Sequence, residues 1–414
     1  AKAISGIETP TRYSIVFRLT APTAALLVQA LSLPITAPVP PEFARRYDKA
    51  NPSTYGEHLI STGPYTLARY RPGVSAVLKR NPSWNRRTDW RPAYADEIDF
   101  RLGQSVSVAS RQIIGGQNLV SGDFSAPASQ LRSDLADSRR RRQIALAPGV
   151  GVLLIALNTT VPPLNNLNVR RAISAATDRV ALRLTRGGPA AGTIATHYLF
   201  PSMPGFRQAG GFAGTGAPFL SHPHGDLALA RSYMRKAGYP SGRYTGKARL
   251  LMITGTEPTG RQAAQVLEGS LAALGLKVNL RSVSGTAMYS KFCGVPAAHV
   301  AICPDLGWLK DFYDPQAVLE PMFDGTRISR EGSSNWSQLD DPAIDRAMRR
   351  GEALIGAGAR ADAWGRIDRL ITQQAAAIPW LWVNQANMRS ADVRGVVNDF
   401  TASWDLSFTD PAGA

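Results

Sequence analysis

Residues that could do chemistry are few in this sequence, and the two cysteines are the most informative of them. Cys293 and Cys303 are ten positions apart. A close pair of this kind is typical of one structural disulfide in an exported protein, or of two reduced core thiols in a cytosolic one. His299 lies between them, but a metal site needs more ligands than these neighbours provide. The disulfide is the preferred interpretation, and no bound metal is expected.

Sequence motifs of the common catalytic sites are absent. The chain has no G-x-S-x-G, no H-E-x-x-H and no phosphate-binding G-x-x-x-x-G-K-[ST]. His222 and His224 flank Pro223 in an expected loop, where two surface histidines are a simpler interpretation than a metal site. Because catalytic groups can lie far apart in sequence, the absence of these motifs counts against an enzyme without excluding one. A hydrolase on a two-lobed α/β scaffold is the alternative, and turnover of peptides by the purified protein would reveal it.

The composition is that of a globular protein with more than one domain. The chain has 414 residues, of which 44% are hydrophobic and 19% charged. This length is too great for one ordinary core, so two or three domains or lobes are expected. No apolar run is long enough to span a membrane. The best candidate, Ala21 to Pro40, contains four prolines that would break a spanning helix.

The net charge of +16 raises the question of a nucleic-acid partner. The basic residues are spread along the whole length, and the one cluster, Arg139 to Arg142, lacks interleaved aromatic residues on which bases could stack. No nucleic-acid partner is therefore expected. A steep loss of binding with salt, dependent on that cluster, would indicate the contrary.

Hydrophobic periodicity alternates between strands and helices along the chain. Alternating or continuous apolar runs predict strands at residues 13–19, 63–70, 74–80, 98–102, 150–157, 247–253, 277–283 and 378–383. Apolar residues at helical spacing predict helices at 169–186, 226–238, 260–274 and 361–376, and one more that begins at Asp341. Asp226 and Asp341 are placed as N-caps, and Gly238 and Gly275 follow helix ends. The pattern predicts a mixed α/β chain without internal repeats.

Six segments, in order, resemble one family. They are Ser61 to Pro82 (STGPYTLARYRPGVSAVLKRNP), Leu157 to Arg179 (LNTTVPPLNNLNVRRAISAATDR), Asp226 to Pro240 (DLALARSYMRKAGYP), Gly307 to Pro315 (GWLKDFYDP), Asn335 to Asp345, and Ala361 to Trp382. Each is similar to a motif of the oligopeptide/dipeptide/nickel-binding proteins of ABC importers, the extracellular solute-binding proteins of family 5. The resemblance covers residues 1–408.

The resemblance implies an α/β, bilobal type II periplasmic-binding-protein-like fold with discontinuous lobes. Residues 1–60 are expected to be the remnant of a small domain. Residues 61–155 and 378–414 are expected to form lobe I, and residues 156–377 to form lobe II. The opening of the family's pattern has no counterpart here, so its N-terminal part is expected to be missing.

The resemblance also implies site residues. In peptide-binding members an acidic residue that here corresponds to Asp311 holds the α-amino group of the ligand, while Trp308, Tyr313 and Asp314 are the further candidates for ligand contact. The simpler alternative is that Asp311 and Asp314 only cap a turn before Pro315. One departure concerns residues 254–258, which lack the arginine that holds the α-carboxylate in dipeptide binders. Strict dipeptide specificity is therefore not expected.

The function implied is the extracytoplasmic capture of oligopeptides in a cleft between two lobes, with delivery to an ABC permease that a separate ATPase drives. The alternative is the same fold with a non-peptide solute, such as an oligosaccharide, glycopeptide, metal chelate or haem. The expected location is the periplasm or the cell surface, where a lipid anchor outside this chain would provide the membrane contact. The resemblance also implies that the protein is not an enzyme, needs no cofactor for binding and acts as a monomer.

Overall fold

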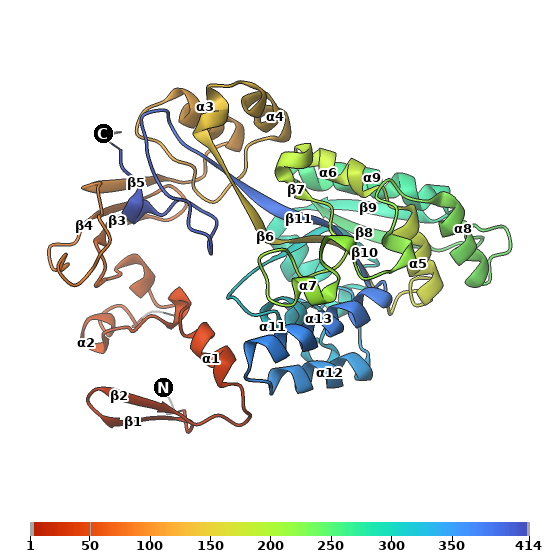
Figure 1. The fold of residues 1–414 in the computed structure, drawn as a ribbon, viewed down its shortest axis with the longest axis horizontal. Coiled ribbons are helices and arrows are strands. Elements are labelled where there is room, and N and C mark those ends of the chain that lie inside the picture. Colours follow the sequence, from red (N-terminus) through yellow and green to blue (C-terminus); the bar gives the residue numbers. More distant parts are fainter. Residues whose placement is uncertain (1–3, 50, 412–414) are drawn as a thin grey trace. The chain divides into compact units, whose positions relative to one another are not determined.

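The computed structural model describes residues 4–49 and 51–411, and its chain forms two compact units (Figure 1). Unit 1 contains the residues up to Thr36, Gly151–Thr185 and Gly192–Val383. Unit 2 contains Ala37–Val150, Arg186–Ala191 and the residues from Asn384 onward. Both units are therefore discontinuous in sequence. The expected division into residues 1–60, 61–155 with 378–414, and 156–377 stays a prediction.

A mixed six-stranded sheet is the centre of unit 1. Its order is β7 (Gly192–Thr193), β11 (Ala377–Met388), β6 (Ile144–Leu157), β10 (Ile302–Leu309), β8 (Arg249–Gly255) and β9 (Lys277–Val283). Strands β8 and β9 pair in parallel from Arg249 opposite Lys277 to Gly255 opposite Val283. Strand β10 runs parallel to β8 and antiparallel to β6. Parallel neighbours require a crossover, and the helix between β8 and β9 provides it.

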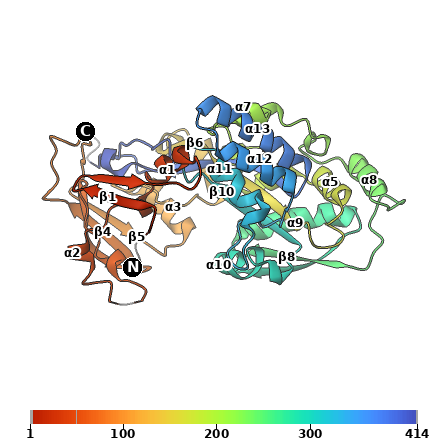
Figure 2. The ribbon, with the colours of Figure 1, turned by 90° about the horizontal axis from the view of Figure 1, so that it is seen from below.

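Two groups of helices accompany this sheet (Figures 1 and 2). The first consists of α5 (Leu167–Ala176), α6 (Arg179–Thr185), α8 (Leu227–Lys236) and α9 (Pro258–Ala273), and α9 packs against β8, β9 and β10. The second consists of α7 (Phe206–Ala209), α11 (Gln316–Phe323), α12 (Pro342–Glu352) and α13 (Ala357–Gln373). Between the sheet and α11–α13 lies the largest core cluster, with the fully buried Leu154, Trp364 and Trp382 among its members. Each such side chain contributes roughly 1.5–3 kcal/mol on burial.

The prediction of a single helix over residues 169–186 was wrong, because the structure has two helices there, α5 and α6. Helix α5 ends at Thr177, whose backbone is extended. The carboxylate of Asp178 then accepts a hydrogen bond from the amide of Ala181 at 2.8 Å, which caps the first turn of α6. Apolar spacing continues across the break, so periodicity alone does not reveal it.

The other helix boundaries confirm the cap predictions. Asp226 accepts a hydrogen bond from the amide of Leu229 at the start of α8, and Asp341 accepts from the amides of Ala343 and Ile344 at the start of α12. Gly238 and Gly275 both have positive φ after a helix end. These polar and glycine signals act locally, which is why sequence alone locates them.

Unit 2 contains a three-stranded antiparallel sheet of β3 (Tyr65–Arg71), β4 (Ser75–Arg80) and β5 (Glu97–Arg101), which confirms the strands predicted at residues 63–70, 74–80 and 98–102; β3 and β4 form a hairpin. Its helices are α2 (Pro41–Ala44), α3 (Val106–Gly115) and α4 (Ala128–Ala136). A small core of Ile113, Ala126, Leu131, Ala386 and Met388 joins two distant parts of the chain.

The remaining strands and α-helices, together with a π-helix, belong to unit 1. They are the hairpin of β1 (Ile7–Thr11) and β2 (Ser14–Phe17), helix α1 (Ala24–Ala30), the short helix α10 (Gly285–Ala287) and a π-helix at Met288–Cys293. The α/β class expected from the sequence is confirmed. Within the described residues, no helix combines the length and the apolar character needed to cross a membrane.

Candidate functional site

The candidate site lies at the end of β10, where the strand leads through a loop at residues 310–315 into α11. Two glycines allow this strand to lie close to β6. A Cβ atom on Gly307 would come within 2.6 Å of Leu153 Cδ2, and one on Gly151 within 2.5 Å of the Trp308 carbonyl oxygen. The glycine before Trp308 is therefore a packing requirement of the sheet, and it sets the position of the residues that follow.

Asp311 lies in this loop, at the surface of unit 1. Partial burial raises the pKa of its carboxyl group above the ordinary value of an aspartate. In the described part of the chain, burial is the one cause of this shift, and no cation or N–H group offsets it. A carboxylate in that situation gains from a positive charge placed beside it. The geometry thus suits a cationic ligand group.

Aromatic side chains surround the end of β10. Trp308 is partly buried, donates from Nε1 to the carbonyl oxygen of Ala317 at 2.8 Å, and its ring centroid lies 6.0 Å from that of Trp336. Tyr289, on the π-helix, lies 5.7 Å from Trp336 on the same measure. Tyr313 is 54% exposed in the loop. Sequence analysis did not identify Trp336 or Tyr289, because they come from distant segments.

Asp314 lies three positions after Asp311, but its side chain is buried, whereas that of Asp311 is at the surface. It is 4% exposed, and its two carboxylate oxygens accept from Arg360 Nε at 2.9 Å and from Arg360 Nη2 at 2.8 Å. Its Oδ1 also accepts from the amide of Gln316 at 2.9 Å, at the start of α11. These contacts correspond to the capping alternative for Asp314. Arg360 is a partner that sequence analysis missed, since nothing near it in sequence marks it.

A disulfide joins Cys293 and Cys303, as expected, with the two Cα atoms 6.3 Å apart. Both residues are buried. The bridge connects the end of the π-helix that carries Tyr289 to the strand that carries Trp308. It therefore fixes two of the elements that position the aromatic side chains.

Because both thiols are consumed in this bridge, maleimide is expected to label neither cysteine in the unfolded, unreduced protein. After reduction, the same unfolded sample should gain two labels, which serves as the control. Intact-protein mass spectrometry gives the number of labels. Two labels without reductant would show free thiols and contradict the bridge.

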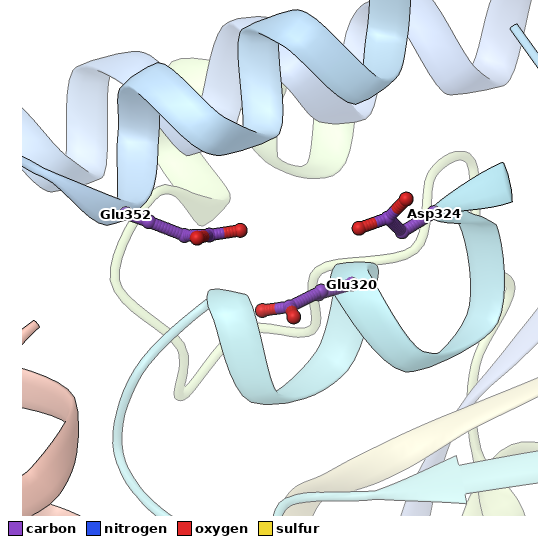
Figure 3. A group of neighbouring side chains, drawn as sticks. All are labelled: Glu320, Asp324 and Glu352. Carbon is purple, nitrogen blue, oxygen red and sulfur yellow. The ribbon is translucent and has the colours of Figure 1, made fainter. Parts of the chain in front are cut away.

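Three carboxylates lie close together in space, and Figure 3 shows Glu320 from α11 and Asp324, the residue directly after α11, facing Glu352 at the end of α12. One oxygen of each lies within 4.8 Å of the others. Glu320 accepts hydrogen bonds from Arg327 and Gln316. Oδ2 of Asp324 lies 3.8 Å from Nε of Arg327. Burial and the charge of Glu320 raise the pKa of Glu352. Arg327 supplies positive charge to this group, and the expectation that no metal is needed stays a prediction.

The two loop histidines do not share a site. Nε2 of His222 lies 3.7 Å from Oδ2 of Asp226, and Nδ1 of His224 lies 3.9 Å from Oδ1 of Asp178. Both side chains are largely exposed, at 61% and 73%. Each therefore has its own surface carboxylate.

Comparisons with known proteins point to one family. The family described as "Bacterial extracellular solute-binding proteins, family 5 Middle" matches residues 1–330. The chain is 23% identical over 401 residues to the probable ABC transporter periplasmic-binding protein SapA of Escherichia coli, covering 96% of this chain and 68% of that protein. It is 23% identical over 361 residues to the haem-binding protein A of Haemophilus influenzae, covering 86% of this chain and 61% of that protein. The chain thus spans about two thirds of the length of these relatives.

A solved structure is similar over almost the whole chain. The clavulanic acid biosynthesis oligopeptide binding protein 2 aligns with a TM-score of 0.84 and 28% identity, covering 99% of this chain and 72% of that one. The bilobal fold class expected from the sequence is therefore that of its structural relatives. The family match covers well over half of the chain. This chain belongs to the bacterial extracellular solute-binding proteins of family 5.

Proposed function

We propose that this chain captures oligopeptides outside the cytoplasm, as the solute-binding component of an ABC importer. Its family consists of extracellular solute-binding proteins. Its similarity to a protein named for oligopeptide binding, over 99% of the chain, supports peptides as the ligand. The Escherichia coli relative is named as a probable ABC transporter periplasmic-binding protein, and this name supports the transport role.

The observation that carries the proposal is the position of the Asp311 carboxyl group, at the surface in the loop between β10 and α11 and two positions before the exposed Tyr313. The raised pKa of this carboxyl group agrees with a site that lacks a positive charge. A peptide's α-ammonium group would supply the missing charge and form a charge-assisted hydrogen bond. Trp308 and the exposed Tyr313 would contact the first peptide residues. Because aromatic surfaces accept many side chains, this arrangement favours broad sequence preference.

The preferred peptides would be longer than dipeptides. Residues 254–258, which run from the end of β8 through a short loop to the start of α9, contain no arginine that could pair with a nearby α-carboxylate. Without that pair, the distance between the two peptide ends is not fixed. We therefore propose ligands whose C-terminus lies away from this loop.

The partners follow from the same role. The loaded protein would deliver peptide to a permease, and a separate ATPase would supply the energy. The chain would act as a monomer in the periplasm or at the cell surface, without catalysis or a cofactor.

A non-peptide solute is the second candidate. The similarity to a protein named for haem binding favours it. A haem or another metal chelate would then occupy the place proposed for the first peptide residues.

Native mass spectrometry of the protein as purified, followed by denaturing release of the bound material, tests the proposal. A ladder of masses separated by amino-acid residues is the expected result. A single non-peptide mass would instead favour the second candidate. If the protein is empty, titration with a mixture of five-residue peptides decides, and the absence of binding to all of them would contradict peptide capture.

A further inference from the structure

Arg360 is a buried cation in the first turns of α13, and it is 4% exposed. Its guanidinium donates to both carboxylate oxygens of Asp314, at 2.9 and 2.8 Å, in a bidentate pair. Nη2 also donates to Gln316 Oε1 at 3.0 Å. One side of this arginine therefore holds the end of the 310–315 loop and the start of α11.

The other side of Arg360 holds the segment that joins α12 to α13. Nη1 donates to the carbonyl oxygens of Gly351 at 3.0 Å, Glu352 at 3.1 Å and Leu354 at 2.9 Å. These carbonyls lie at the end of α12, where a helix leaves its last carbonyls without internal partners. The arginine thus connects the loop after β10 to the helices packed in the core of unit 1.

All three guanidinium nitrogens of Arg360 are occupied by these protein contacts, and so are both carboxylate oxygens of Asp314. Among the described residues, Arg360 and Asp314 thus bind mainly each other and neighbouring protein groups, and Asp314 Oδ2 accepts only the bond from Nε. Yet Asp314 follows the exposed Tyr313 directly and lies three positions after Asp311. A second tie, from Trp308 Nε1 to the carbonyl oxygen of Ala317, closes the other side of the same loop. The loop is short, and both of its ends are fixed.

We infer that Arg360 is a positioning residue for the ammonium-binding carboxylate: its pair with Asp314 fixes the 310–315 loop so that Asp311 is held ready for a cationic ligand group. The inference rests on the proposed function of Asp311. A carboxylate on a mobile loop would have to be ordered when the ligand binds, whereas a fixed loop avoids that loss of entropy. Planar bidentate pairing also explains why an arginine, rather than a lysine, occupies the position.

The test compares two peptides of identical sequence, one with a free N-terminus and one N-acetylated, by calorimetric titration of the full chain. The Kd of the acetylated peptide divided by the Kd of the free peptide measures recognition of the ammonium group. This ratio does not depend on how much of the protein is folded. In Arg360→Gln, the Kd for the free peptide is expected to rise about fivefold, with the ratio falling toward one. Arg360→Lys should restore part of the ratio, because it keeps the charge but loses the fork.

A matched control is Arg170→Gln. Arg170 is also buried in unit 1 and donates to the carbonyl oxygens of Leu164, Asn165 and Gln374, but among the residues that the structure describes it has no carboxylate partner. This substitution should lower stability and leave the Kd ratio unchanged. If Arg360→Gln does not fold, the double variant Asp314→Asn/Arg360→Gln removes both charges without leaving one buried and unpaired, and it is measured in its place.

The outcomes separate the two levels of the proposal. The absence of binding to either peptide would contradict the proposed function. A wild-type protein that binds free and acetylated peptides equally would contradict the proposed role of Asp311, and the inference with it. If wild type distinguishes them and Asp311→Asn does not, the role of Asp311 stands. The inference about Arg360 would then be overturned by an Arg360 variant that keeps the wild-type ratio.

Discussion

Asparagine at position 311 is expected to weaken the binding of a peptide with a free N-terminus by more than tenfold. The substitution keeps the shape of the side chain and removes the charge that would face the ligand's ammonium group. A hydrogen bond to a charged partner contributes about 1.5–3 kcal/mol net, and 1.4 kcal/mol corresponds to a factor of ten in Kd. Calorimetric titration of Asp311→Asn against wild type measures the difference.

A matched control for this variant is Asp362→Asn, which removes an exposed carboxylate from α13 and should leave peptide affinity unchanged. Acetylation of the peptide provides the other side of a thermodynamic cycle. It should weaken binding to wild type and have little further effect on Asp311→Asn. An unchanged affinity in Asp311→Asn would remove Asp311 from the site.

The raised pKa of Asp311 also fixes the direction of the pH dependence. Before binding, this carboxyl group takes up a proton at a higher pH than an ordinary aspartate does, whereas a bound ammonium group favours the charged form. Affinity is therefore full above the pKa of the free group and falls as the pH is lowered through it. In Asp311→Asn this part of the pH dependence should disappear.

The local parts of this fold were accessible from sequence because their causes are local. Asp226 and Asp341 cap helices with their own side chains, and the hairpin around Gly73 depends on a turn residue with positive φ. The break at Thr177 was missed, although Asp178 is a typical capping residue. The apolar spacing continues across the break, and it outweighed a single polar signal.

The site shows a different limit. Asp311 and Trp308 were identified because they share one short segment with a family motif, and their roles as ligand contacts stay predictions. Arg360 lies 46 positions after Asp314 and contacts it through helix packing alone. Likewise, Glu352 meets Glu320 and Asp324 only because α12 packs beside α11. Contacts between elements distant in sequence depend on the whole core, which one sequence read locally does not specify.

The same dependence on distant contacts is strongest at Asp368, on α13. Its carboxylate accepts hydrogen bonds from His197 Nδ1 at 2.9 Å and from the amides of Tyr198 at 3.1 Å and Leu199 at 2.8 Å. Thr372 donates its hydroxyl at 3.3 Å. Asp368 and His197 are both fully buried, so water cannot replace any of these bonds.

Asp368→Ala is therefore expected to lower the free energy of unfolding by about 3–5 kcal/mol, because it leaves the imidazole N–H and two amides buried without an acceptor. Asp368→Asn keeps one acceptor oxygen, so its free energy of unfolding should lie between those of Asp368→Ala and wild type. The control is Glu97→Ala, which breaks an exposed pair with Lys79 at 3.4 Å and should cost less than about 1 kcal/mol. Guanidinium unfolding followed by tryptophan fluorescence measures all three, since Trp364 and Trp382 lie in the same core as Asp368's helix. A loss in Asp368→Ala no larger than that of the control would mean that the segment at 197–199 is held by packing rather than by this carboxylate.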